Sequence, residues 1–147
     1  MSDPVTALSG ARVQGYVTVT EAPPVGMVTL RCRAAPSSQV VMAVARQHGD
    51  EPAGTYGLLR LLRRFESSED PALSGLLRHV TLCAVPQANP DGSDRLSRWT
   101  PSGANQNRDW SAQRLPETRA VAAQVRALSP LVLLDLHEQT PRDTDGT

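Results

Sequence analysis

The sequence predicts an α/β protein with a mainly parallel, mixed sheet, an antiparallel hairpin at one edge and helices on both faces. Continuous apolar runs of strand length alternate with helix-length segments, and two strand-like segments near the N-terminus flank Pro23 and Pro24. Continuous apolar strands are typical of sheets buried on both faces, and strand–helix alternation is typical of parallel pairing. With 147 residues, of which 39% are hydrophobic, the chain is expected to form a single domain over residues 1–147.

The first elements follow from hydrophobic periodicity. Residues 15–20 alternate as a strand does, and residues 26–34 follow the two prolines, which predicts the edge hairpin. Residues 39–45 contain an unbroken apolar run and predict a buried strand. Pro52 then begins a helix, because its missing N–H is unneeded in the first turn. Its apolar face comprises Leu58, Leu59, Leu61, Leu62 and Phe65, and its solvated face Arg60, Arg63 and Arg64.

The later elements follow the same alternation. Residues 67–71 are a polar break, and residues 80–85 predict another buried strand. Residues 116–128 predict a helix that begins at a proline, and residues 131–136 a last buried strand. Residues 86–115 form a loop of a length that usually indicates function in a compact domain.

Charge and composition exclude several classes of protein. Fifteen basic residues, all arginine, balance fifteen acidic ones, so neither a nucleic-acid partner nor an anionic membrane surface is expected. Cys32 and Cys83 lie inside apolar runs and are expected to be buried thiols rather than a disulfide. Residues 1–10 do not resemble a signal peptide, and no run reaches membrane-spanning length, so a cytoplasmic location is expected.

Three polar side chains follow two of the buried strands. His48 and Glu51 stand three residues apart after one strand, and His137 follows the last. The carboxyl ends of parallel strands meet at one edge of a sheet, where ligands bind. Two histidines and one glutamate are the ligands of a hydrolytic zinc centre, which keeps one position open for water. The sequence therefore predicts a Zn²⁺ site built from His48, Glu51 and His137.

The order of these motifs resembles the zinc carboxypeptidases of the peptidase M14 type. The resemblance covers about residues 40–137 and includes the Asn-Pro-Asp-Gly run at 89–92, Arg98, Asn107 and Arg108. It implies the three-layer fold of that family and a metallocarboxypeptidase function, in which zinc-activated water hydrolyses the C-terminal bond of a peptide or peptide-like amide. The partner implied is a substrate with a free carboxylate.

The resemblance also implies roles for the loop residues. Asn107 and Arg108 would hold the substrate carboxylate, since a guanidinium matches that group with two parallel hydrogen bonds. Arg98 best matches the arginine that polarises the scissile carbonyl and stabilises the oxyanion, with Arg95 as the alternative. His79 has no ligand partner at useful spacing and is expected to be structural or exposed.

Two residues are candidates for supporting the zinc ligands. Asn105 stands where the family commonly has an aspartate that accepts a hydrogen bond from the first zinc histidine. Asparagine accepts that bond without charge, and Asp135, on the strand face of His137, is a candidate to compensate. If the strand continues through Glu138, this residue is expected on the opposite face, because side chains alternate along a strand, and it is not assigned as general base.

The family's mechanism uses two further residues, a late glutamate as general base and a late tyrosine. Both would follow Thr147, and neither Tyr16 nor Tyr56 stands in a suitable place. The sequence therefore predicts an incomplete domain whose last strand exposes an apolar edge, and an activity about 10²–10⁴-fold below that of a complete enzyme.

Two other functions remain open. A deacylase of the aspartoacylase or succinylglutamate desuccinylase type shares the zinc residues and the Asn-Arg pair, although the Asn-Pro-Asp-Gly run favours the peptidase. A non-catalytic zinc-binding module is the alternative of another class.

Overall fold

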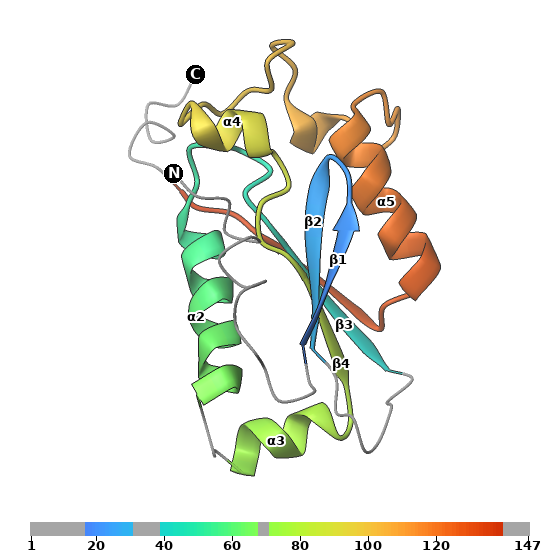
Figure 1. Cartoon of the computed structure of the whole chain (residues 1–147). Helices are drawn as coiled ribbons and strands as arrows, with labels where there is room; N and C mark the ends of the chain where they lie inside the picture. The colour runs from blue at the N-terminus through green and yellow to red at the C-terminus, as the bar shows by residue number, and fades with distance from the viewer. Residues whose placement is uncertain (1–16, 31–38, 68–70, 140–147) are drawn as a thin grey trace.

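The computed structural model describes residues 17–30, 39–67 and 71–139, which form a five-stranded mixed sheet with helices on both sides (Figure 1). The order of the strands across the sheet is β1-β2-β4-β3-β5. The elements are β1 (Val17–Ala22), β2 (Val25–Leu30), β3 (Val40–Ala45), α2 (Ala53–Ser67), α3 (Pro71–Leu77), β4 (Thr81–Val85), α4 (Pro90–Asp94), η1 (Gln106–Arg108), α5 (Pro116–Leu128) and β5 (Val132–Leu136).

Strand pairing confirms the predicted fold class. β1 and β2 form the antiparallel edge hairpin, with Val19 opposite Val28, and β2 continues antiparallel onto β4. β3 pairs in parallel with β4 on one side and β5 on the other. Residues 15–16 and 31–34 of the predicted hairpin lie outside the described residues.

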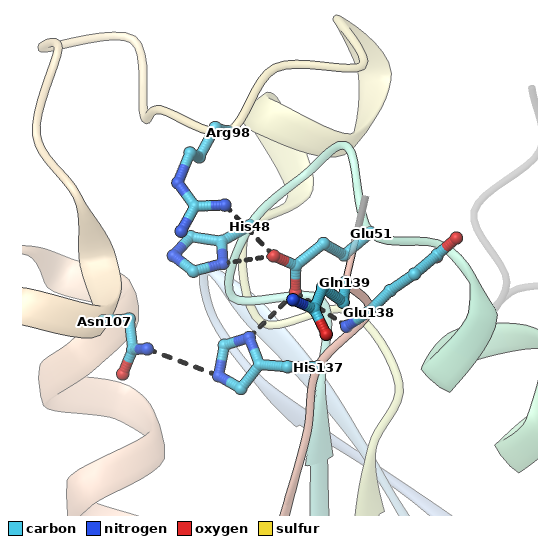
Figure 2. Close-up of a pocket in the computed structure, with 7 residues that line it drawn as sticks. All are labelled: His48, Glu51, Arg98, Asn107, His137, Glu138 and Gln139. Carbon is cyan, nitrogen blue, oxygen red and sulfur yellow. Dashed lines mark hydrogen bonds and ion pairs between the residues drawn. The ribbon is translucent and has the colours of Figure 1, made fainter. Parts of the chain in front are cut away.

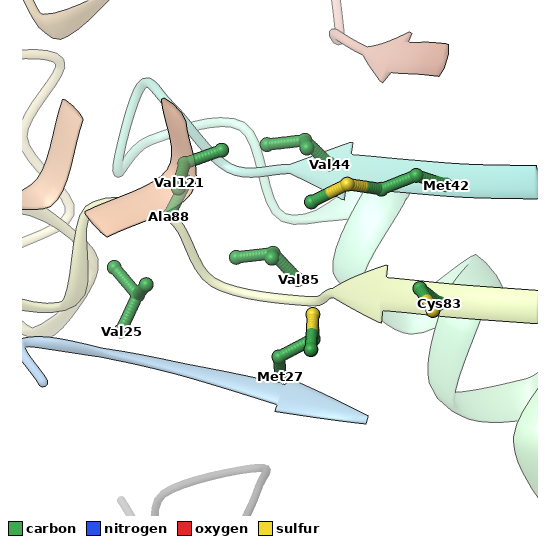
Figure 3. Close-up of a cluster of buried hydrophobic side chains, with 8 residues drawn as sticks. All are labelled: Val25, Met27, Met42, Val44, Cys83, Val85, Ala88 and Val121. Atoms are coloured by element: carbon green, nitrogen blue, oxygen red, sulfur yellow. The ribbon is translucent and has the colours of Figure 1, made fainter. Parts of the chain in front are cut away.

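The two faces of the sheet are covered by different helices (Figure 1). Met42 and Val44 of β3 belong to a buried cluster with Val121 of α5, whereas the alternating Ala43 and Ala45 pack with Leu58 of α2. Figure 3 shows the α5-side cluster, which comprises Val25, Met27, Met42, Val44, Cys83, Val85, Ala88 and Val121. Because both faces are covered, every residue of the strand can be apolar, as its continuous run predicts.

Helix α2 has the predicted faces. Leu58 and Leu62 are buried, and the arginines at 60, 63 and 64 are exposed. The side chain of Phe65 lies outside the described residues. Helix α3 was not predicted, because seven residues are too few to show a period; it is held by Leu77, which packs with Leu62. His79, just after α3, is exposed as expected.

Cys83 is a buried free thiol in the centre of the sheet. Burial raises the pKa of the thiol, and a contact of 3.7 Å with the Thr29 hydroxyl partly opposes that shift. A neutral, enclosed thiol packs as a small apolar side chain, as predicted. Cys32 lies outside the described residues.

Strand β5 presents an apolar edge. Leu131 is 68% exposed, and the next three side chains, Val132, Leu133 and Leu134, are exposed by 42–48%. Among the described residues, β3 is the neighbour of β5 in the sheet. The predicted apolar edge is therefore present. None of the helices in the described ranges has the length and apolar character that a membrane crossing requires.

Candidate metal centre

Three side chains from two strand ends converge on one point (Figure 2). The loop after β3 supplies His48 and Glu51, both buried, and the residue after β5 is His137. His48 Nδ1 lies 2.7 Å from Glu51 Oε1, and His137 Nδ1 lies 2.8 Å from Glu51 Oε2. One ligand atom from each residue lies within 4.8 Å of the other two, a spacing that suits a single metal ion.

The outer nitrogens of both imidazole rings show that this donor set fits zinc. His48 Nε2 lies 3.2 Å from Asn105 Oδ1, and His137 Nε2 lies 3.2 Å from Asp135 Oδ2. Each ring can therefore keep its proton on Nε2 and direct the lone pair of Nδ1 inward. A hydrogen-bond acceptor behind each histidine is the usual arrangement in zinc sites.

The Glu51 carboxylate is kept ionised by its neighbours. Burial alone would raise the pKa of Glu51, but the Glu138 backbone N–H and the rings of His137 and His48 together lower it below its usual value. Arg98 Nη1 also donates to Glu51 Oε1 at 3.2 Å. A charged carboxylate between two imidazoles suits a divalent cation.

The loop that carries His48 and Glu51 is fixed by buried bonds to the next loop. Arg46 has a φ of 60°, uncommon outside glycine, and its Nε donates to Gly49 O at 3.0 Å. Asn89, which is fully buried, donates from Nδ2 to Gln47 O at 3.3 Å and accepts from Gly92 N through Oδ1. The Asn-Pro-Asp-Gly run at 89–92 thus builds α4 and supports the metal loop from outside.

The structure places the two candidate arginines differently. Arg98 lines an open pocket of about 370 Å³ together with the three metal-site residues, while Arg95 is exposed at the end of α4 and is not among the residues that line this pocket. Figure 2 shows Arg98 on one side of Glu51 and Asn107 on the side of His137.

The two residues of the Asn-Arg pair lie in different places, one in the pocket lining and the other on the surface. Asn107 lines the pocket, and its Nδ2 lies 3.4 Å from His137 Nε2. Arg108 is exposed, donates to Asn107 O at 3.4 Å and is not among the lining residues. The pocket thus combines cationic, amide and imidazole groups around the Glu51 carboxylate, a set that can bind an anionic or polarised carbonyl group next to a metal.

Glu138 caps a helix. Its Oε2 accepts a hydrogen bond from Ala53 N at 2.9 Å, at the start of α2, while its own N–H donates to Glu51 Oε2 at 3.1 Å. Strand β5 ends at Leu136, so the predicted alternation does not extend to Glu138, which lines the pocket while its carboxylate is engaged by a helix N-terminus.

Three supporting residues could not be assigned from the sequence: Arg46, Gln47 and Trp110. Gln47 is 1% exposed and bonds both Asp135 and Trp110, and Arg46 is 3% exposed. For Arg46 and Gln47 the signal in the sequence was position: two long polar residues follow the apolar strand before His48, where they must find partners if the loop is buried.

Asp109 anchors the end of the long loop to α5. Its Oδ1 accepts from Arg114 N at 2.9 Å and its Oδ2 from Leu115 N at 2.8 Å. Burial alone would raise the pKa of Asp109, but these backbone bonds outweigh it, so the pKa lies below its usual value. The ionised carboxylate thus fixes the segment between η1, which carries the pocket residue Asn107, and α5.

Asp109→Asn is expected to lower the free energy of unfolding at pH 7 by about 1–3 kcal/mol, because an amide accepts only one of the two bonds. In the wild type, this contribution is complete above the unfolded pKa of about 4 and is lost as the pH falls through the lower folded pKa. Urea titrations between pH 7 and pH 2.5 measure both effects. Equal stability of variant and wild type at pH 7 would contradict the anchoring role.

Comparison with known proteins gives a consistent family. A family model described as zinc carboxypeptidase matches residues 12–128. The chain is 31% identical over 93 residues to Carboxypeptidase 2 of Trichophyton tonsurans, which covers 63% of this chain and 17% of that protein. The chain thus spans about a sixth of the length of this curated relative.

Solved structures agree with the sequence matches. A metallo-carboxypeptidase from Burkholderia cenocepacia superposes with a TM-score of 0.80 at 29% identity, covering 92% of this chain and 39% of that one. A metallo-carboxypeptidase from Pseudomonas aeruginosa, solved in complex with (2-guanidinoethylmercapto)succinic acid, gives 0.77 at 25% identity, covering 92% and 38%. An aspartoacylase family protein from Mesorhizobium loti, with a TM-score of 0.57 at 24% identity over 77% of this chain and 34% of that one, shares the fold alone.

Proposed function

Since this chain belongs to the zinc carboxypeptidase family, we propose that it forms the metal centre of a metallocarboxypeptidase acting on peptides or peptide-like amides with a free C-terminal carboxylate. The observation that carries the proposal is the convergence of His48, Glu51 and His137 beside Arg98 in one open pocket. When bound, Zn²⁺ would supply Lewis-acid polarisation and a water of lowered pKa.

The residues of the chain would hold the metal and stabilise the charge that develops on the substrate. His48 and His137 would offer Nδ1, with their Nε2 protons held by Asn105 and Asp135, and Glu51 would supply the carboxylate. Arg98, about one third exposed, is placed to face a substrate carbonyl and to stabilise the negative charge that develops on its oxygen.

The substrate carboxylate would be held by the η1 segment. Asn107 already lines the pocket, and Arg108 is the next residue along the chain. An exposed arginine side chain has the length and freedom to reorient towards an anion, to which it can donate two parallel bonds. The succinic acid derivative bound to the Pseudomonas aeruginosa protein is itself a dicarboxylic acid, which supports carboxylate recognition in this family.

A general base is also needed to take a proton from the attacking water. Glu138, the pocket carboxylate outside the metal set, is engaged at the start of α2. We propose that proton transfer uses a glutamate outside the described residues, since loss of a general base typically lowers the rate about 10²–10⁴-fold.

Hydrolysis of three matched compounds tests the proposal. The zinc-loaded chain is incubated with a dipeptide carrying a free carboxylate, with its C-terminal amide and with an N-acyl amino acid, and the released amino acid is quantified by mass spectrometry. We expect zinc-dependent release from the free dipeptide. Preferential hydrolysis of the N-acyl amino acid would favour the deacylase, and tight binding of the succinic acid derivative with no turnover of any compound would favour the non-catalytic module.

The arginine pair supplies a matched comparison for the same assay. Arg98→Ala is expected to lower the rate of hydrolysis by about 10²–10³-fold, as loss of an oxyanion donor does. Arg95→Ala removes a neighbouring exposed arginine outside the pocket lining and should leave the rate unchanged. A larger loss of hydrolysis rate in Arg95→Ala than in Arg98→Ala would assign the oxyanion role to Arg95 instead.

A further inference from the structure

Gln47 is a buried polar side chain with a partner at each end. It is 1% exposed and precedes the metal-site residue His48. Its Oε1 accepts a hydrogen bond from Trp110 Nε1 at 2.8 Å, and its Nε2 donates to Asp135 Oδ1 at 2.5 Å. A buried amide satisfied at both ends is fixed in place.

The chemistry of the two partners fixes the orientation of this amide. An indole N–H only donates, so the oxygen of Gln47 must face Trp110. An ionised carboxylate only accepts, so the amide NH₂ must face Asp135. A reversed amide would place donor against donor at one end and acceptor against acceptor at the other.

The same chain of bonds continues to the third metal-site residue. Asp135 Oδ2 lies 3.2 Å from His137 Nε2, and His137 Nδ1 faces Glu51. Asn107 Nδ2, which is a donor, lies 3.4 Å from the same nitrogen and could bond it only if Nε2 carried no proton. When a metal ion binds through the Nδ1 lone pair, the proton of the ring must lie on Nε2, where the Asp135 carboxylate accepts it.

The bonds also connect parts of the fold that differ in how firmly they are held. Trp110 packs against the α5-side core cluster, whereas Asp135 and His137 belong to the edge strand β5 and the residue after it. The register places Asp135 opposite Val44, so it lies beside the end of β3, from which Gln47 reaches it. The bonds of Gln47 thus connect the third metal-site residue to the core.

We propose that Gln47 is a positioning residue that acts through Asp135 to hold the His137 ring with Nδ1 directed at the metal, with Trp110 as its anchor in the core. The inference rests on the proposed function only in taking His137 as a zinc ligand. It assigns to this chain a hydrogen-bonded sequence Trp110–Gln47–Asp135–His137 behind the metal.

Zinc affinity, measured by competition with a chromophoric chelator on the whole chain, tests the inference without any substrate. Gln47→Met keeps the length of the side chain and removes both bonds, and is expected to weaken zinc binding about 10–100-fold. Gln47→Glu should weaken it at least as much, because its carboxylate can accept from Trp110 but repels Asp135.

A double-mutant cycle separates positioning from general damage to the fold. In an Asp135→Ala background, Gln47→Met is expected to cause no further loss of affinity, since its effect passes through Asp135. In ¹H–¹⁵N spectra of the zinc-loaded chain, the Nε2 proton of His137 should exchange slowly in the wild type and rapidly in Gln47→Met. Trp110→Phe, which keeps an aromatic ring and removes the N–H, should shift affinity and exchange in the same direction if Gln47→Met fails to fold.

Each outcome of these measurements has a definite meaning. Unchanged affinity in Gln47→Met, or additive losses in the cycle, would overturn the inference and leave the zinc site standing. A wild-type chain that binds no zinc would overturn the metal site and the inference together. A chain that binds zinc and shows no further loss of affinity for Gln47→Met in the Asp135→Ala background, but hydrolyses no substrate, would support the inference and count against the proposed function.

Discussion

Glu51→Gln is expected to reduce the zinc content of the purified chain from about one ion per molecule to a trace, measured by elemental mass spectrometry. Glu51 is 3% exposed and provides the carboxylate that faces His48 and His137. An amide carries no charge, and one end of it would present NH₂ to a cation. The loss should exceed the ~10–100-fold change in affinity that follows removal of an outer partner.

Glu138→Gln is the matched control for this substitution. Glu138 also lines the pocket, but its side chain accepts a bond from Ala53 N, and the bond to Glu51 comes from its backbone. A glutamine oxygen can still accept from Ala53 N, so zinc content should remain near that of the wild type. Equal zinc loss in both variants would mean that Glu51 is not the ligand.

Gly49→Ala is expected to lower the free energy of unfolding by at least about 3 kcal/mol, the upper end of losses from overpacking, or to prevent folding. A Cβ at this position would overlap the carbonyl of Gly92 and the backbone nitrogen of Ser93. These are backbone atoms of two residues that are held in place by other bonds: Gly92 N donates to Asn89 Oδ1, and Ser93 O accepts from Arg46. The two loops would have to separate, which would also displace His48 and Glu51.

Gly57→Ala, the same substitution at another position, is expected to have the opposite effect on the free energy of unfolding. Gly57 is exposed in α2, and a Cβ there would meet nothing within 4 Å. Alanine should therefore stabilise the chain by about 0.5–1 kcal/mol through its higher helix propensity. Thermal and urea unfolding of the two variants measure the contrast. A Gly49→Ala chain as stable as the wild type would show that the two loops are not in close contact.

The fold could be predicted well because the buried strands have an unambiguous pattern. The apolar runs that form β3 and β4 are too uniform for a half-exposed strand, and the structure covers both of their faces. The short α3 and α4 were missed, because five or seven residues cannot show a helical period. Tertiary contacts, such as the packing of Leu77 under α2, determine such elements.

The metal-site residues could be predicted because the chemistry of zinc restricts residue type and the fold restricts position. His48, Glu51 and His137 meet because the strands that precede them are neighbours with parallel register. The structure also shows that Gly49 makes room for the backbone of Gly92. Contacts between loops distant in sequence, like the bonds of Gln47, have no periodic signal and could not be predicted.

Strand β5 is held on one side by β3, and it leads directly to His137, while His48 and Glu51 follow the central strand β3. Such an edge strand is among the parts of a fold that open most readily through local unfolding. A metal ion shared between the two strand ends would make opening of β5 require loss of a ligand. Metal occupancy and the fraying of this edge are therefore thermodynamically linked, and ligation would slow amide hydrogen exchange along β5 more than in the β1–β2 hairpin.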